Sequence, residues 1–132
     1  MKTRLLLVLT AMIMVCSTQA QKVKIDVGLL KDDIVAKENF VVKIIDEDLN
    51  TTEVKSIKRF TAELEYDKEY KIIFYCEGCQ PKFIYFDTNT SDKRKLKYIF
   101  NVSLKSTENQ DIVNAGGVYY DSRAQEFTYY LN

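Results

Sequence analysis

Two cysteines and the turn between them are the residues of this sequence best suited to chemistry. Cys76-Glu77-Gly78-Cys79 separates two apolar runs, a pattern typical of a β-hairpin with Glu77 and Gly78 in its turn. Residues directly opposed across such a hairpin have Cα atoms about 4.5–5.5 Å apart, which a disulfide accepts. The sequence therefore predicts a disulfide between Cys76 and Cys79, or an inert pair of thiols.

Two other chemistries fit this pair of cysteines less well. Thiol–disulfide exchange uses a cysteine whose pKa is lowered at a helix N-terminus, and no helical pattern follows Cys79. A zinc site needs four ligands, whereas the sequence holds only one further cysteine, Cys16, and no histidine. Exchange through Cys76 and Cys79 stays open as the alternative function, that of a periplasmic thiol–disulfide protein.

The absence of histidine bounds the catalytic options. With no histidine in the chain, nucleophile systems that depend on one, and the commonest general base, are missing. Carboxylate pairs such as Asp32-Asp33 fall in polar turns, without an apolar pocket to raise a pKa. The sequence therefore predicts a protein that is not an enzyme and that uses no cofactor.

An acidic segment offers a weak calcium candidate. Asp46, Asp48 and Asn50 have the i, i+2, i+4 spacing that opens a calcium-binding loop. The sixth position is Thr51 where such loops need glycine, and the twelfth is Ile57 where they need glutamate. A solvated acidic turn is the preferred interpretation, and no metal site is predicted.

Four tyrosines crowd the C-terminal end of the chain. Tyr119 and Tyr120 belong to one β-strand pattern, and Tyr129 and Tyr130 belong to the next. Because neighbours in a strand point to opposite faces, one tyrosine of each pair should pack inside while the other lies outside. The pairs either stabilise the hairpin across its strands or form an exposed aromatic patch for a protein or glycan partner.

The elements that position these residues are β-strands. Beyond residue 21 the apolar side chains alternate with a period of two, and no stretch has helical periodicity. The predicted strands, bounded by polar turns, cover residues 23–29, 40–45, 52–57, 60–64, 70–76, 83–86, 98–104, 118–120 and 127–130. Short strands at regular spacing predict an all-β, Ig-like sandwich of about seven to nine strands.

The first 20 residues have the pattern of a signal peptide. Lys2 and Arg4 precede an apolar run that is too short to span a bilayer, and Ala20 ends a small-residue cleavage motif. A lipoprotein cleaved before Cys16 is the less favoured alternative, because the bulky Val15 precedes that cysteine. The sequence predicts an exported protein, periplasmic or extracellular, with residues 21–132 forming one β-sandwich domain.

The charge of that domain limits its partners. Lys2 and Arg4 are the charged residues of the first 20, so residues 21–132 hold two more acidic than basic side chains. No basic excess remains to attract nucleic acid. No apolar segment after the signal peptide is long enough to cross a membrane as a helix. We therefore expect neither nucleic-acid binding nor a transmembrane segment after cleavage.

The middle of the chain holds YKIIF at 70–74, Gly78 and KFIYFDT at 82–88. With weaker similarity back to Ile25, these residues resemble the carboxypeptidase-regulatory-like, or transthyretin-like, domain of small secreted bacterial proteins. Residues 97–132 resemble the C-terminal extensions of such proteins. Arg59 replaces the usual glycine, and Cys79 replaces the aromatic residue that follows the turn. The resemblance implies a Greek-key sandwich that is exported and serves binding or assembly, without catalysis.

Taken together, these patterns predict a non-catalytic, exported β-sandwich module. Its partner is expected to be a protein or glycan of the cell envelope, contacted through strand edges or through the tyrosines of the last hairpin.

Overall fold

The computed structural model describes residues 21–131, and every regular element in that range is a β-strand. The ten strands are β1 (Lys22–Lys31), β2 (Ile34–Val35), β3 (Phe40–Ile45), β4 (Thr51–Ser56), β5 (Arg59–Glu65), β6 (Glu69–Cys76), β7 (Lys82–Asp87), β8 (Leu96–Leu104), β9 (Val113–Asp121) and β10 (Glu126–Tyr130). The predicted signal peptide and Cys16 lie outside the described residues.

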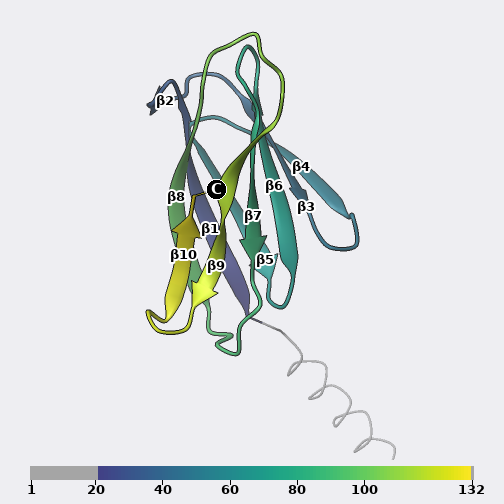
Figure 1. Ribbon diagram of the computed structural model, residues 1–132, viewed down its shortest axis with the longest axis vertical. Helices are drawn as coiled ribbons and strands as arrows, with labels where there is room; N and C mark the ends of the chain where they lie inside the picture. The colour runs from purple at the N-terminus through teal and green to yellow at the C-terminus, as the bar shows by residue number, and fades with distance from the viewer. Residues whose placement is uncertain (1–20, 132) are drawn as a thin grey trace, which may run out of the picture.

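The strands form two sheets. The smaller one is built around β1, which pairs antiparallel with β5 and β2 and parallel with β8. The larger one has the order β10-β9-β7-β6-β3-β4, and only the β9–β7 pair in it is parallel. Figure 1 shows β7, β6 and β3 side by side, with β9 and β10 on one flank and β4 on the other.

One hydrophobic core lies between the sheets. Strands of both sheets turn alternate side chains inward, as β3 does with Phe40, Val42 and Ile44. Four phenylalanines are almost completely buried there: Phe40, Phe60, Phe74 and Phe86. The predicted all-β fold is confirmed, and its two sheets over a shared core form a sandwich.

Nine predicted strands are present, and β2 is the one that sequence patterning missed. It contributes only Ile34 and Val35, too short a segment to show a period of two. The turn before it was predicted, and its residues Asp32 and Asp33 both have positive φ, 50° and 65°. Two such residues in succession match the twist of a two-residue hairpin, which returns β2 along the end of β1.

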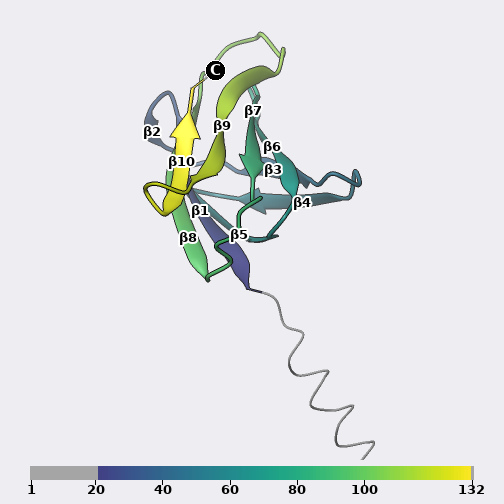
Figure 2. The same ribbon diagram turned by 60° about the horizontal axis from the view of Figure 1, so that its bottom comes forward.

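An aromatic cluster joins the two sheets where β10 meets β8. The Tyr98 ring of β8 lies 5.9 Å from that of Phe86 and 6.4 Å from that of Phe127, between ring centroids. Phe86 and Phe127 are themselves 5.3 Å apart. Figures 1 and 2 both place β10 beside β8. This packing anchors the C-terminal hairpin to the core, and with it the tyrosines of its outer face.

A buried threonine fixes the end of β7. The Thr88 hydroxyl lies 2.7 Å from the carbonyl oxygen of Glu65 and 2.9 Å from that of Lys68, and it accepts a hydrogen bond from the Lys68 amide. These bonds tie the β5–β6 turn to the residue that follows β7. Because buried polar groups must be paired, Thr88 fixes the position of Asp87 relative to Glu69.

Within residues 21–131 the structure contains no helix long and apolar enough to cross a membrane.

Candidate functional site

The two cysteines occupy the first and last positions of the β6–β7 turn. The Cys79 amide donates to the Cys76 carbonyl oxygen at 3.1 Å, and Gly78 has φ 74°. The predicted hairpin is confirmed, but the prediction that the cysteines oppose each other in the ladder is wrong. Ladder pairing begins at Phe74 and Lys82, with one extra residue on the β7 side. Cys76 instead pairs across with β3, and Cys79 bridges to the segment after β8.

Both thiols are free and buried in the structure, so the predicted disulfide stays a prediction. Burial raises the pKa of Cys76 to about 12, helped by the neighbouring Cys79 and by the Glu38 carboxylate, 3.7 Å from its sulfur. A nucleophilic cysteine needs the opposite shift. The burial of both thiols and the raised pKa of Cys76 therefore give no support to thiol exchange at this turn.

The calcium candidate is an acidic turn in which the Asp46 carboxylate is hydrogen-bonded by residues of the same turn. Asp46 accepts hydrogen bonds from the Asp48 and Asn50 amides through Oδ1, and from the Asn50 side chain through Oδ2. The Lys68 ammonium lies 3.9 Å from the same carboxylate. The Asp46 oxygens thus serve as the cap of an Asx-type turn. Among residues 21–131, no three acidic, cysteine or histidine side chains are grouped so as to hold a metal ion.

The four C-terminal tyrosines divide between the two faces of the sheet, as predicted. Tyr119 and Tyr130 are 41% and 44% exposed on the outer face, with ring centroids 5.6 Å apart. Tyr120 and Tyr129 pack against the core. Tyr129 donates a hydrogen bond to the Ala115 carbonyl oxygen. An exposed aromatic pair is therefore present on this hairpin.

A third tyrosine completes the exposed group. Tyr85 of β7 and Tyr130 of β10 are both register partners of Gly117 in β9, one on each side of it. Gly117 has no side chain, and the Tyr130 ring lies over it. Tyr85 is 46% exposed. The β9–β10 hairpin and the distant strand β7 thus bring three tyrosines together around one glycine.

These tyrosines line a cavity of about 450 Å³ on the outer face of the larger sheet. Glu69 and Asp87, which are register partners in β6 and β7, line it as well. We call the group Glu69, Tyr85, Asp87, Tyr119 and Tyr130 the tyrosine hollow. The hollow presents three aromatic rings and two carboxylates to a ligand, a composition suited to binding.

The rest of this face carries lysines above aromatic rings. The Lys71 ammonium lies 4.3 Å from the centroid of the Phe83 ring, and the Lys43 ammonium lies 5.2 Å from that of Tyr75. Both distances are within the range of a cation–π contact. On the outer face of β3, β6 and β7, two aromatic rings are thus each paired with a lysine side chain.

The outer face of the smaller sheet is of a different kind. Its centre is Asp26, which Arg59 engages through two hydrogen bonds of 2.5 and 3.1 Å, with Lys97 at 3.8 Å. The Arg59 guanidinium holds the pKa of Asp26 below its ordinary value. The charges of Asp26, Arg59 and Lys97 are thus paired within the protein, so this centre offers less to a partner than the tyrosine hollow does.

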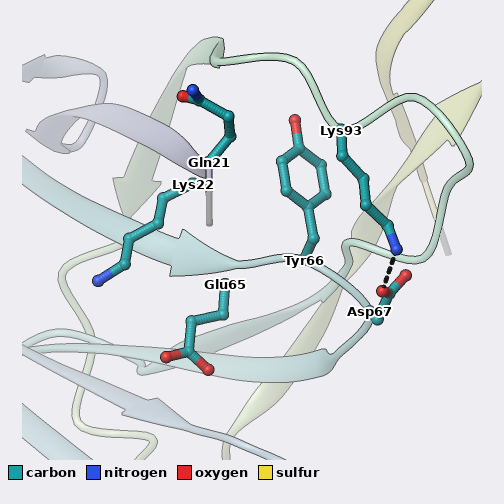
Figure 3. A pocket seen from close by; sticks show the side chains of 6 residues that line it. All are labelled: Gln21, Lys22, Glu65, Tyr66, Asp67 and Lys93. Atoms are coloured by element: carbon teal, nitrogen blue, oxygen red, sulfur yellow. Dashed lines mark ion pairs between the residues drawn. The ribbon is translucent and has the colours of Figure 1, made fainter. Parts of the chain in front are cut away.

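A second cavity, of about 580 Å³, lies beside the first described residue. Figure 3 shows Tyr66 between Gln21 and Lys93, with Lys93 paired to Asp67 at 2.5 Å. The Tyr66 hydroxyl donates to the Arg94 carbonyl oxygen, and Glu65 pairs with a neighbouring lysine at 3.0 Å. Its polar groups are largely engaged with one another, so it is the weaker candidate.

A hydrogen bond from Tyr120 joins an ion pair in the loop after β7 to the C-terminal hairpin. Arg94 donates to both carboxylate oxygens of Asp92, and the Tyr120 hydroxyl donates to Asp92 as well. These hydrogen bonds hold the pKa of Asp92 far below its ordinary value of 3.8. These contacts fix β9 from its inner side, opposite the outward-facing Tyr119.

We expect the substitution Asp92→Asn to lower the melting temperature at neutral pH and to matter less in acid. The folded-state pKa of Asp92 lies below its unfolded value of 3.8, so its stabilisation is fully present above that value and is lost as the pH falls toward the folded pKa. Thermal unfolding of both proteins from about pH 7 to about pH 2 tests this. Asp111→Asn, at an exposed loop position, should follow the wild type throughout. A gap between the Asp92→Asn variant and wild type that is equal at every pH would contradict the assignment.

No protein-family model matches this chain, and no curated protein matches it. The resemblance to the transthyretin-like domain therefore stays a prediction that rests on the residues at 70–74 and 82–88.

Proposed function

We propose that this chain is an exported, non-catalytic β-sandwich module, with the Greek-key arrangement of transthyretin-like domains, that binds a protein or glycan of the cell envelope. The contact is made through the outer face of the larger sheet. The observation that carries the proposal is the tyrosine hollow, where three tyrosines each 41–46% exposed surround one cavity. Export to the periplasm or the extracellular space is supported by the signal-like pattern of residues 1–20.

The physical case for binding is that three large rings stay exposed in one place. Tyrosine brings a large contact area with few rotatable bonds, so it loses little entropy when a partner covers it. Packing behind the rings adds to this, since Val118 and Phe86 fix the strands from the core side. The rings are therefore held in position before a partner arrives, which lowers the cost of association.

Binding without catalysis also agrees with the available side chains. The chain has no histidine, and the pKa of Cys76 is raised rather than lowered. The tyrosine hollow offers rings for contact and carboxylates for hydrogen bonds or ion pairs.

Site-specific photo-crosslinking tests this proposal. A benzophenone amino acid replaces Tyr119 in one variant and, as the matched control, Ile99 in another; Ile99 is 58% exposed on β8 of the smaller sheet. Both variants are exported and irradiated in the cells that naturally make the protein. We expect a discrete crosslinked species from position 119 and none from position 99. Equal crosslinking from both positions, or none from position 119, would overturn the proposal.

A further inference from the structure

We infer that the tyrosine hollow receives a basic side chain, lysine or arginine, presented by a protein partner. This inference rests on the proposed function and names the chemistry of the contact. Its basis is charge complementarity: Glu69 and Asp87 line the cavity together with three tyrosine rings, and none of its lining residues is basic. A cation entering the hollow would meet two carboxylates and the faces of aromatic rings at once.

On the same face of the sheet, two aromatic rings already contact a lysine ammonium of the protein itself. Phe83 and Tyr75 each lie beneath a lysine ammonium, at 4.3 and 5.2 Å. Among the described residues, no lysine or arginine makes such a contact with Tyr85, Tyr119 or Tyr130. The three tyrosines of the hollow thus repeat the arrangement of their neighbours and leave the cation to be supplied from outside.

The shape of the hollow favours a compact cation over a flat sugar ring. The Tyr119 and Tyr130 rings are inclined at 51° to each other, so they do not form one flat platform. Gly117 lets the Tyr130 ring lie against the sheet beside Tyr85. Aromatic rings in different planes beside two carboxylates match a side chain that ends in an ammonium or guanidinium group.

The unpaired negative charges of Glu69 and Asp87 support this assignment. Asp87 Oδ1 accepts two hydrogen bonds from Asn89, through the backbone amide and the side chain. Neither Glu69 nor Asp87 forms an ion pair with another described residue. Their negative charge is therefore available to a ligand, in contrast to that of Asp26 on the other sheet, which Arg59 neutralises.

Titration with defined probes tests the inference. The probes are a blocked trilysine peptide, the same peptide with its lysines acetylated, and two neutral oligosaccharides, chitohexaose and maltohexaose. Affinity is measured by isothermal titration or tyrosine fluorescence at low and high salt. We expect the trilysine peptide to bind, added salt to weaken it, and the acetylated peptide and both oligosaccharides to bind at least about tenfold more weakly.

Two pairs of variants locate the effect. Tyr119→Leu and Glu69→Gln should each weaken trilysine binding by about 3- to 30-fold. Their controls lie on the same face outside the hollow: Tyr75→Leu, whose ring already has a lysine, and Glu53→Gln on β4. The controls should leave the affinity unchanged, and circular dichroism checks that all four variants fold.

The inference would be overturned by no trilysine binding at millimolar concentration, by equal binding of the acetylated peptide, or by equal losses in the hollow and control variants. Oligosaccharide binding that depends on Tyr119 would also refute it while leaving the proposed function intact. Loss of the crosslink at position 119 would instead remove the proposed function itself, so the two failures are distinguishable.

Discussion

Replacing Phe86 with alanine is expected to lower the free energy of unfolding by about 3–5 kcal/mol. The Phe86 side chain is fully buried, and its ring packs against Tyr98 of the smaller sheet and Phe127 of the last strand. Its removal leaves a cavity where the two sheets and the C-terminal hairpin meet. The loss therefore combines the transfer of a large apolar group with the cost of a void that a close-packed core does not refill.

Urea denaturation of the two proteins measures this effect. Ile99→Ala serves as the control, since that side chain is 58% exposed and its truncation should change stability by no more than about 0.5 kcal/mol. A loss below about 1 kcal/mol for Phe86→Ala would mean that the two sheets do not share the core described here.

Replacing Gly116 with alanine is expected to destabilise the protein by at least about 2 kcal/mol and to detach β10. Gly116 has φ 113°, a conformation that residues with a side chain rarely adopt. A methyl group there would also lie less than 3.0 Å from the carbonyl oxygen of Tyr130, which is a backbone atom and cannot rotate away. The backbone strain at position 116 and the collision with Tyr130 therefore both destabilise the pairing of β9 with β10.

A second glycine separates these two causes. Gly78 also has positive φ, 74°, but a methyl group added to it would meet nothing within 4 Å. Gly78→Ala should therefore cost only the left-handed strain, about 1–2 kcal/mol. Hydrogen exchange of the β10 amides should rise in Gly116→Ala and stay unchanged in Gly78→Ala. Equal behaviour of the two variants would contradict the contact with Tyr130.

The positions of the strands follow closely from the sequence, because their signal is local. β3 was predicted with its observed bounds from a dense run of β-branched and aromatic residues, which is a property of six consecutive positions. Pairing between distant strands is not local. No pattern within β7 or β9 indicates that they run parallel and side by side, since that contact is made by the core and not by a turn.

The same limit explains what was missed at the candidate site. Alternation along the last two strands predicted that one tyrosine of each pair would face outward, and Tyr119 and Tyr130 do so. Tyr85, Glu69 and Asp87 were not predicted, because they join the group only through the β7–β9 and β6–β7 pairings. The outward position of Tyr85, between the buried Ile84 and Phe86, was the available signal.

The cysteine turn shows a different limit. Its existence was predictable from Glu77-Gly78, but the opposition of the two cysteines depended on the ladder register. One extra residue between Cys79 and Lys82, in the stretch that contains Pro81, shifts that register. A bulge of this kind is set by how the following strand pairs, which the turn sequence alone does not determine.

The most direct test of the central claim is to map where a cation binds. Nuclear magnetic resonance spectra of the labelled protein, recorded during titration with the blocked trilysine peptide, give this location residue by residue. We expect the shifted signals to cluster at Glu69, Tyr85, Asp87, Tyr119 and Tyr130, on one face of the larger sheet. Shifts centred instead on the cavity beside Gln21 and Lys93, or on the outer face of the smaller sheet, would contradict the claim.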